Sequence, residues 1–282
     1  MLLPGSDSQA LAAALADATG ERLGAVSYER FADGERLVEV PVLDGERAVV
    51  VCATASDAAH VECLQLQDAA REAGASEVVT VLPYMGYARQ DRAFVDGQPV
   101  SARAVARAVG TGADRVVVVD PHEDGVLEHF GVPAEAVTAA ARLADPLPDL
   151  ADPLFLSPDG GAVDLAEAVR DAYGAGDADH FRKERDRDTG AVQVTPGDVD
   201  VAGRDVVVTD DIVATGSTVS EAVGALRERD AGRVLVACVH AVLAGNARTK
   251  LATAGVDRVV ATDTLEREVS AVSAAPTVAD AL

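Results

Sequence analysis

Short apolar runs alternate along the first half of the chain with segments of helical periodicity. The apolar runs cover residues 47–55, 77–84 and 114–120, and the segment 57–74 has the spacing of an amphipathic helix. Valine-rich runs that are apolar throughout are typical of strands buried on both faces of a parallel sheet. The pattern therefore predicts β-α-β units.

The alternation restarts after residues 144–153, a segment with three prolines and no periodicity that is interpreted as a linker. The later apolar runs are LFLSPD, DVVVTDD, RVLVACVHAV and DRVVATD. Two similar α/β domains are therefore expected, at residues 1–143 and 144–282, each a mostly parallel sheet flanked by helices. This division leaves open that the last few residues pack against the N-terminal domain.

The charge of the chain is extreme. The formal net charge is −23, and only Lys183 and Lys250 among the 24 basic residues are lysines. Such a surface repels nucleic acid and acidic membranes. Molar salt screens charges beyond roughly 3 Å, so an acidic, lysine-poor chain suits a salt-filled, halophilic cytoplasm. A merely acidic mesophilic protein is the alternative, but it leaves the scarcity of lysine unexplained.

The cysteines and the N-terminus indicate a reducing compartment. Cys52, Cys63 and Cys238 lie in apolar contexts without metal-binding or paired spacing, so they are expected to be buried, free thiols. The N-terminus shows no basic stretch ahead of an apolar one, and no run approaches 18 apolar residues. A cytoplasmic protein without membrane or nucleic-acid partners is expected.

The stretch VVVTDDIVATGSTVSEAV, residues 206–223, carries the clearest chemistry. A strand is followed by a Gly-containing turn and a helix, so backbone N–H groups and hydroxyls can surround a phosphate. No Walker lysine is present, which favours a phosphate monoester, and two carboxylates just before the turn can accept hydrogen bonds from vicinal sugar hydroxyls. Helix capping would explain one Asp, but not the pair plus the turn. The predicted ribose 5-phosphate site consists of Asp210, Asp211, Thr215, Gly216, Ser217 and Thr218.

This stretch resembles the phosphoribosyl-pyrophosphate binding motif, which phosphoribosyltransferases share with ribose-phosphate pyrophosphokinases. Two further stretches, FADGE (31–35) and PYMGYARQDR (83–92), resemble the ATP-binding elements of the pyrophosphokinases. The arginines of the second stretch, in so acidic a chain, also favour an anionic partner over a surface loop with ordinary salt bridges. The resemblance implies ATP contacts from Phe31, stacked on adenine, from Asp33 and Glu35 at its edge, and from Arg89 and Gln90.

The resemblance also implies phosphoribosyltransferase-type folds for both domains and a homo-oligomer, because the family usually shares its adenine site between subunits. Magnesium is the implied cofactor. His122, in DPHEDG, matches a family Asp-x-His that helps to hold the magnesium–nucleotide complex, and Asp159, in LSPDGG, matches a magnesium ligand. The alternatives are a structural histidine at a strand end and an Asp-Gly turn without a ligand.

Lys183 lies in HFRKERDRDTG, although the chain otherwise avoids lysine. Phosphoryl-type transfer needs cations that neutralise charge developing on phosphate oxygens. The family carries a Lys and, two residues later, an Arg on a mobile loop, which implies that Lys183 and Arg185 are catalytic. The alternative is an exposed loop that balances its own carboxylates.

Together these stretches imply a ribose-phosphate diphosphokinase that converts ATP and ribose 5-phosphate into phosphoribosyl pyrophosphate and AMP. A phosphoribosyltransferase or a non-catalytic regulatory subunit remains the alternative. Ala214 stands where many family members have an acidic residue, so a mechanism that needs a third carboxylate there is not implied. EDGVLEHF replaces the glutamine-rich stretch after the Asp-x-His, so allosteric control is not implied. VLAGNA (242–247) and TDT (262–264) resemble closing segments of the family and receive no catalytic role.

Overall fold

The computed structural model describes residues 1–158, 160–185, 192–195 and 199–282. The chain forms two compact units. Unit 1 contains residues 1–138, 264–266 and 273–282, and unit 2 contains residues 139–263 and 267–272. The proline-containing segment 144–153 thus belongs to unit 2, and the C-terminal residues 273–282 belong to unit 1.

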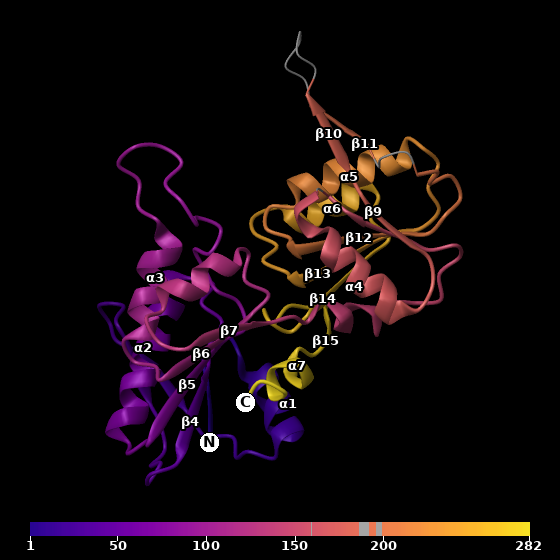
Figure 1. Ribbon diagram of the computed structural model, residues 1–282. Helices are drawn as coiled ribbons and strands as arrows, with labels where there is room; N and C mark the ends of the chain where they lie inside the picture. The colour runs from indigo at the N-terminus through magenta and orange to yellow at the C-terminus, as the bar shows by residue number, and fades with distance from the viewer. Residues whose placement is uncertain (159, 186–191, 196–198) are drawn as a thin grey trace. The chain divides into compact units, whose positions relative to one another are not determined.

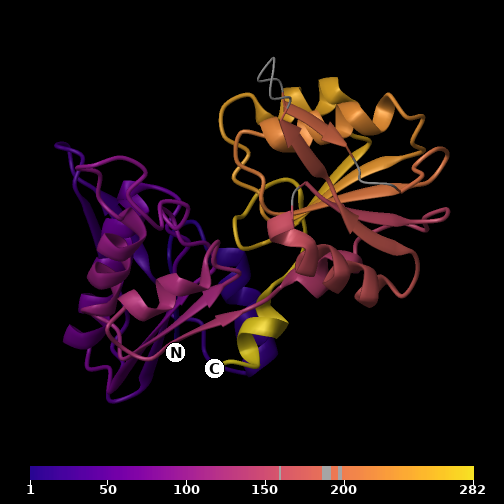
Figure 2. The same cartoon turned by 45° about the horizontal axis from the view of Figure 1, so that its top comes forward.

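Unit 1 is built on a parallel sheet of order β1-β4-β5-β6-β7. Helices α2 and α3 cover one face, and α1 and α7 pack together on the other (Figures 1 and 2). The strands are β1 Leu2–Pro4, β4 Arg47–Val51, β5 Glu77–Leu82, β6 Arg115–Val119 and β7 Ala134–Val137. The helices are α1 Gln9–Thr19, α2 Asp57–Glu72, α3 Ser101–Gly110, the 3-10 helix η1 Asp124–His129 and α7 Ala275–Ala279.

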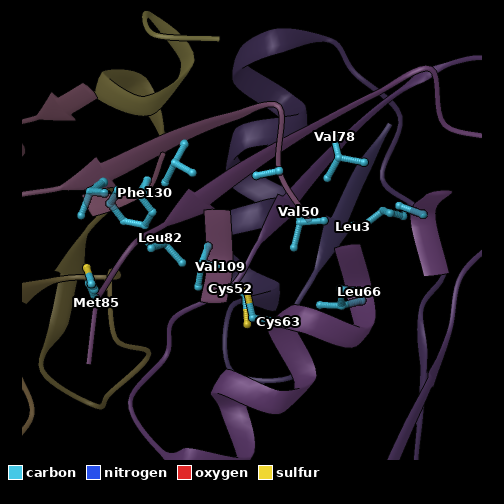
Figure 3. Packing of buried hydrophobic residues seen from close by; sticks show 14 of the residues in the cluster. Leu3, Val50, Cys52, Cys63, Leu66, Val78, Leu82, Met85, Val109 and Phe130 are labelled. Atoms are coloured by element: carbon cyan, nitrogen blue, oxygen red, sulfur yellow. The ribbon is translucent and has the colours of Figure 1, made fainter. Parts of the chain in front are cut away.

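The core of unit 1 follows from the valine-rich strands, which are buried from both sides. Figure 3 shows Cys63 and Leu66 of α2 and Val109 of α3 facing strand residues such as Val50 and Leu82. All five side chains are at most 1% exposed. Each such side chain contributes about 1.5–3 kcal/mol of burial free energy, so the sheet and its helices form one cooperative core.

Unit 2 repeats the plan with a parallel sheet of order β15-β14-β13-β12-β8-β9. Helices α5 and α6 cover one face and α4 the other (Figures 1 and 2). The strands are β8 Leu154–Ser157, β9 Asp177–His180, β12 Val206–Ile212, β13 Val234–His240, β14 Arg258–Thr262 and β15 Ser270–Val272. The helices are α4 Val163–Tyr173, α5 Ser217–Arg227, α6 Ala247–Ala254 and the 3-10 helices η2 Ala140–Ala144 and η3 Gly160–Ala162. The expected α/β class with mostly parallel, helix-flanked sheets is confirmed.

Each unit also carries an antiparallel strand pair outside its main sheet. In unit 1, β2 Ser27–Arg30 pairs with β3 Arg36–Glu39. In unit 2, β10 Arg182–Arg185 pairs with β11 Val192–Thr195. The first pair flanks the stretch 31–35, which is predicted to bind ATP. The second pair contains Lys183 and Arg185, which are predicted to be catalytic.

The three cysteines are buried and free, as expected from their apolar contexts. Burial, together with the nearby Asp210 charge, raises the pKa of the Cys238 thiol well above its ordinary value. Among the described residues, the helices are too short or too polar for any of them to cross a bilayer.

Candidate active site

The FADGE stretch forms the turn that connects β2 to β3 in unit 1. The Phe31 and Glu35 backbones close the turn through a hydrogen bond of 2.8 Å, and Gly34 adopts a φ of 96°. Asp33 Oδ1 accepts a bond from the Glu35 N–H at 3.1 Å, so this carboxylate helps to shape the turn. The Phe31 ring is 44% exposed at the hairpin tip, where an aromatic face is available to a stacking partner.

The turn end of this hairpin is fixed by a buried carboxylate that the sequence interpretation did not single out. Arg36 Nη1 donates to Glu62 Oε2 of α2 at 2.6 Å, and the same carboxylate accepts bonds from the Ser6 backbone N–H and hydroxyl. The Glu62 side chain is only 1% exposed. A buried charge that is paired and hydrogen-bonded specifies one arrangement of its neighbours, so the hairpin is anchored to α2 at Arg36, the first residue after the turn.

The PYMGYARQDR stretch leaves the C-terminal end of β5, which stops at Leu82 because Pro83 follows. Arg89 is exposed and takes part in no ion pair among the described residues. Gln90 instead has local partners: its side-chain amide donates to the Pro99 carbonyl at 3.2 Å and accepts from Ser101 Oγ at 2.5 Å. In this structure Gln90 therefore organises the start of α3.

Tyr87 braces the same loop, a role with no obvious sequence signal. Its backbone adopts a φ of 64°, which is uncommon for a bulky residue. The hydroxyl donates to Asp57 Oδ1 at 2.5 Å, and the ring lies 5.5 Å from that of His60 in α2. The hydrogen bond to Asp57 raises the pKa of Tyr87 and fixes the backbone two residues before Arg89.

His122 follows β6 at the same edge of the unit 1 sheet, because the carboxyl ends of parallel strands coincide. The side chain is exposed. Asp120 turns the chain there with a φ of 37° and accepts a hydrogen bond from Thr138 Oγ1 at 2.7 Å. The Asp of the Asp-x-His thus shapes the turn that presents His122.

Asp210 and Asp211 are the fifth and sixth residues of β12, the strand between β13 and β8 in unit 2. Both are half-buried, and Asp211 Oδ1 accepts a bond from the Ile212 N–H at 2.8 Å. β12 therefore continues through both carboxylates and ends only at Ile212.

The turn after β12 has the geometry expected of an anion nest. Gly216 caps the N-terminus of α5 with a φ of 71°, a conformation that favours glycine. Thr215 Oγ1 and Ser217 Oγ lie 3.2 Å apart, and Thr215, Ser217 and Thr218 are exposed. The first turn of α5 carries no acidic residue and no side-chain cap, although the chain has 47 carboxylates. Among the described residues, no side-chain acceptor therefore masks the N–H groups of this turn.

The VLAGNA segment braces this nest. The Leu243 N–H donates to the Val213 carbonyl at 3.0 Å, and the Ala244 N–H donates to the Ala214 carbonyl at 2.9 Å. Just beyond it, Lys250 of α6 donates from Nζ to Ser217 Oγ at 2.8 Å. The sequence interpretation gave this region no role, although Lys250 is one of only two lysines.

Lys183 and Arg185 lie in β10, where they are in register with Val194 and Val192 of β11. The family resemblance implies a loop for this stretch, whereas residues 182–185 form a strand whose pairing with β11 gives the backbone ladder hydrogen bonds. Asp159 lies outside the described residues. Among the described residues, no group of three or more His, Cys, Asp or Glu side chains is arranged to hold a metal ion.

Comparisons with known proteins identify both parts of the chain. Residues 1–111 match the N-terminal domain of ribose phosphate pyrophosphokinase, and residues 131–275 match the phosphoribosyl transferase domain. The ribose-phosphate pyrophosphokinase of Halobacterium salinarum is 67% identical over 284 residues, covering 100% of both chains. That of Methanopyrus kandleri is 43% identical, covering 100% of this chain and 98% of the relative.

A solved structure agrees with these matches. The crystal structure of phosphoribosylpyrophosphate synthetase from Mycobacterium smegmatis superposes with a TM-score of 0.81 at 30% identity, covering 100% of this chain and 96% of that one. The match of the first 111 residues and the full-length relatives exclude the simpler transferase alternative, and the Halobacterium relative is consistent with a halophilic archaeal source. The chain belongs to the ribose-phosphate pyrophosphokinase family of diphosphate-transferring enzymes.

Proposed function

We propose that this enzyme transfers the β,γ-diphosphoryl group of ATP to the anomeric hydroxyl of ribose 5-phosphate, and that the segment 210–218 holds the sugar. The observation that carries the assignment is the nest at the end of β12. Gly216 opens α5 with unmasked N–H groups and hydroxyls, directly after two half-buried carboxylates. A phosphate ester fits the N–H groups and hydroxyls of the nest, and sugar hydroxyls fit the two carboxylates.

In the proposed step, the anomeric oxygen forms a bond to the β-phosphorus of ATP. The bond between that phosphorus and the oxygen bridging to the α-phosphorus breaks, and its electron pair leaves with AMP. The hydroxyl proton is released, so the products are phosphoribosyl pyrophosphate, AMP and one proton. A loose transition state of this kind is stabilised mainly by positioning and by charge.

The two carboxylates are assigned to the sugar hydroxyls. Consecutive side chains of a strand point to opposite faces. Asp210 and Asp211 are therefore expected to contact different parts of the sugar. Asp210→Asn and Asp211→Asn would test the two contributions separately through the KM for ribose 5-phosphate.

On the nucleotide side, we assign adenine to the hairpin tip and the ATP phosphates to Arg89. The exposed Phe31 ring supports the first assignment, and the lack of an ion pair at Arg89 among the described residues supports the second. Gln90 holds the Arg89 loop through its bonds at the start of α3, and its amide keeps a second N–H donor and a second acceptor lone pair for the nucleotide. Lys183 and Arg185 are assigned to the charge that develops on the transferring group.

Magnesium, when bound with ATP, would neutralise the charge of the β- and γ-phosphates. It prefers oxygen ligands and keeps phosphate and water oxygens in its shell, so a site with few protein ligands fits it. The Asp159 carboxylate is the proposed direct ligand, and the exposed His122 would contact the magnesium–nucleotide complex. We also propose a homo-oligomer with adenine sites shared between subunits, in a reducing, salt-rich cytoplasm.

Labelled ATP tests the proposed transfer. With ribose 5-phosphate in molar potassium chloride, phosphorus-32 in the β-position should appear in the sugar product, because the β- and γ-phosphates move together. A kinase that transfers only the terminal phosphate would leave the β-label in ADP, and that result would refute the proposal. Omission of the sugar is the control, since the label should then stay in ATP.

A further inference from the structure

A lysine from a distant part of unit 2 reaches the hydroxyls of the nest. Lys250 Nζ lies 2.8 Å from Ser217 Oγ, which in turn lies 3.2 Å from Thr215 Oγ1. Lys250 and Ser217 are 33 residues apart in sequence. An ammonium group has three donors, so the bond to Ser217 leaves two for another acceptor at the same place.

The position of Lys250 follows from close packing between α6 and the nest. A Cβ atom placed on Gly216 would lie 3.4 Å from Leu251 Cγ and 3.5 Å from the Ala247 carbonyl oxygen. The backbone of Ala244 is also bonded to that of Ala214. Helix α6 therefore lies directly against the nest, and Lys250 is presented from that helix next to Ser217.

Lys250 differs in its charge environment from two nearby arginines of unit 2. Arg248, on the same helix, pairs with Glu268, and Arg227 of α5 pairs with Asp257. Lys250 takes part in no ion pair among the residues that the structure describes, in a chain with a net charge of −23. One of the two lysines in this acidic chain therefore lies where the contact described for it is with a hydroxyl of the nest.

We propose that Lys250 is a phosphate-binding residue, whose ammonium contacts the 5-phosphate of the sugar together with Ser217. This inference rests on the proposed function of the segment 210–218. A phosphate monoester carries a charge of about −1.5 to −2 at neutral pH and here lies near two carboxylates, so a cation in direct contact offsets their repulsion. In molar salt, charges beyond roughly 3 Å are screened, which makes a contact cation more valuable than a distant one. Lysine suits this role as a compact point charge.

The test compares Lys250→Gln with Arg248→Gln, which removes the same charge from the same helix but breaks a pair with Glu268. Loss of a charged hydrogen bond predicts that Lys250→Gln raises the KM for ribose 5-phosphate at least about tenfold. The KM for ATP and the turnover at saturating sugar should stay within about twofold of wild type. Lys250→Arg, which keeps a cation, should recover part of the lost affinity, and Arg248→Gln should leave all three constants unchanged.

Thermal unfolding with and without ribose 5-phosphate gives an independent readout. Lys250→Gln should unfold at the wild-type temperature without ligand, and the sugar should protect it less than it protects wild type. An unchanged KM and unchanged protection in Lys250→Gln, or equal losses in Arg248→Gln, would overturn the inference. These results are distinguishable from failure of the proposed function, because in that case wild type itself would make no AMP with ribose 5-phosphate.

Discussion

Gly216→Ala tests whether the left-handed turn at the start of α5 is needed for sugar-phosphate binding. Gly216 has a φ of 71°, and an L-residue in that region costs about 1–2 kcal/mol. The added methyl group meets Leu251 at 3.4 Å, which is ordinary van der Waals contact, so the backbone conformation provides the main cost. Equilibrium urea unfolding in molar potassium chloride should therefore show a loss of about 1–2 kcal/mol.

Gly216→Ala should also weaken the binding of ribose 5-phosphate, by more than its loss of folding stability alone would explain. Relief of the strained φ would turn the N–H groups of the nest away from a bound phosphate, and losing one hydrogen bond to a charged group costs about 1.5–3 kcal/mol. The KM for ribose 5-phosphate should rise at least about tenfold, with little change in the KM for ATP.

Gly203→Ala is the matched control. Gly203 has a φ of 73°, and nothing lies within 4 Å of an added Cβ. It should lose a similar free energy of unfolding and keep the wild-type KM for ribose 5-phosphate. The reasoning is refuted if Gly216→Ala binds the sugar normally, or if Gly203→Ala weakens binding as much.

Three other changes have defined outcomes. Lys183→Ala should lower turnover about 100-fold or more while calorimetry still detects ribose 5-phosphate binding, and unchanged turnover would remove its proposed role. Gly224→Ala, within α5 and with nothing within 4 Å of the added Cβ, should raise the free energy of unfolding by up to about 1 kcal/mol in urea, and a loss would contradict the helix assignment. Arg233 hydrogen-bonds to Asp205 and holds the pKa of that carboxyl below its ordinary value of 3.8. In urea unfolding, wild type should therefore lose stability as the pH falls below about 4, and Asp205→Asn should lose less. Equal losses in the two proteins would contradict this link between Asp205 ionisation and stability.

Much of the fold could be predicted because the strands are buried on both faces. Runs such as 48–51 and 206–208 are apolar throughout, which a parallel sheet between two helix layers requires. The nest could be predicted as well, since a strand, Gly216 and a helix are consecutive in the sequence. In both cases the residues of one continuous segment are enough to predict the structure of that segment.

Contacts between distant segments could not be predicted in this way. Lys250 was conspicuous as a rare lysine, but only the fold brings it to Ser217. The bonds of Gln90 to Pro99 and Ser101 could not be predicted either, because they depend on where α3 begins. The carboxylate of Glu62 gives no sequence signal at all, because its burial follows from the packing of the hairpin on α2.

The most direct test of the central claim is product analysis with purified protein, ATP, magnesium and ribose 5-phosphate in molar potassium chloride, with AMP resolved from ADP. Diphosphoryl transfer predicts AMP and phosphoribosyl pyrophosphate in equal amounts, and only when the sugar is present. ADP in place of AMP, or no product from protein shown to be folded in that salt, would contradict it.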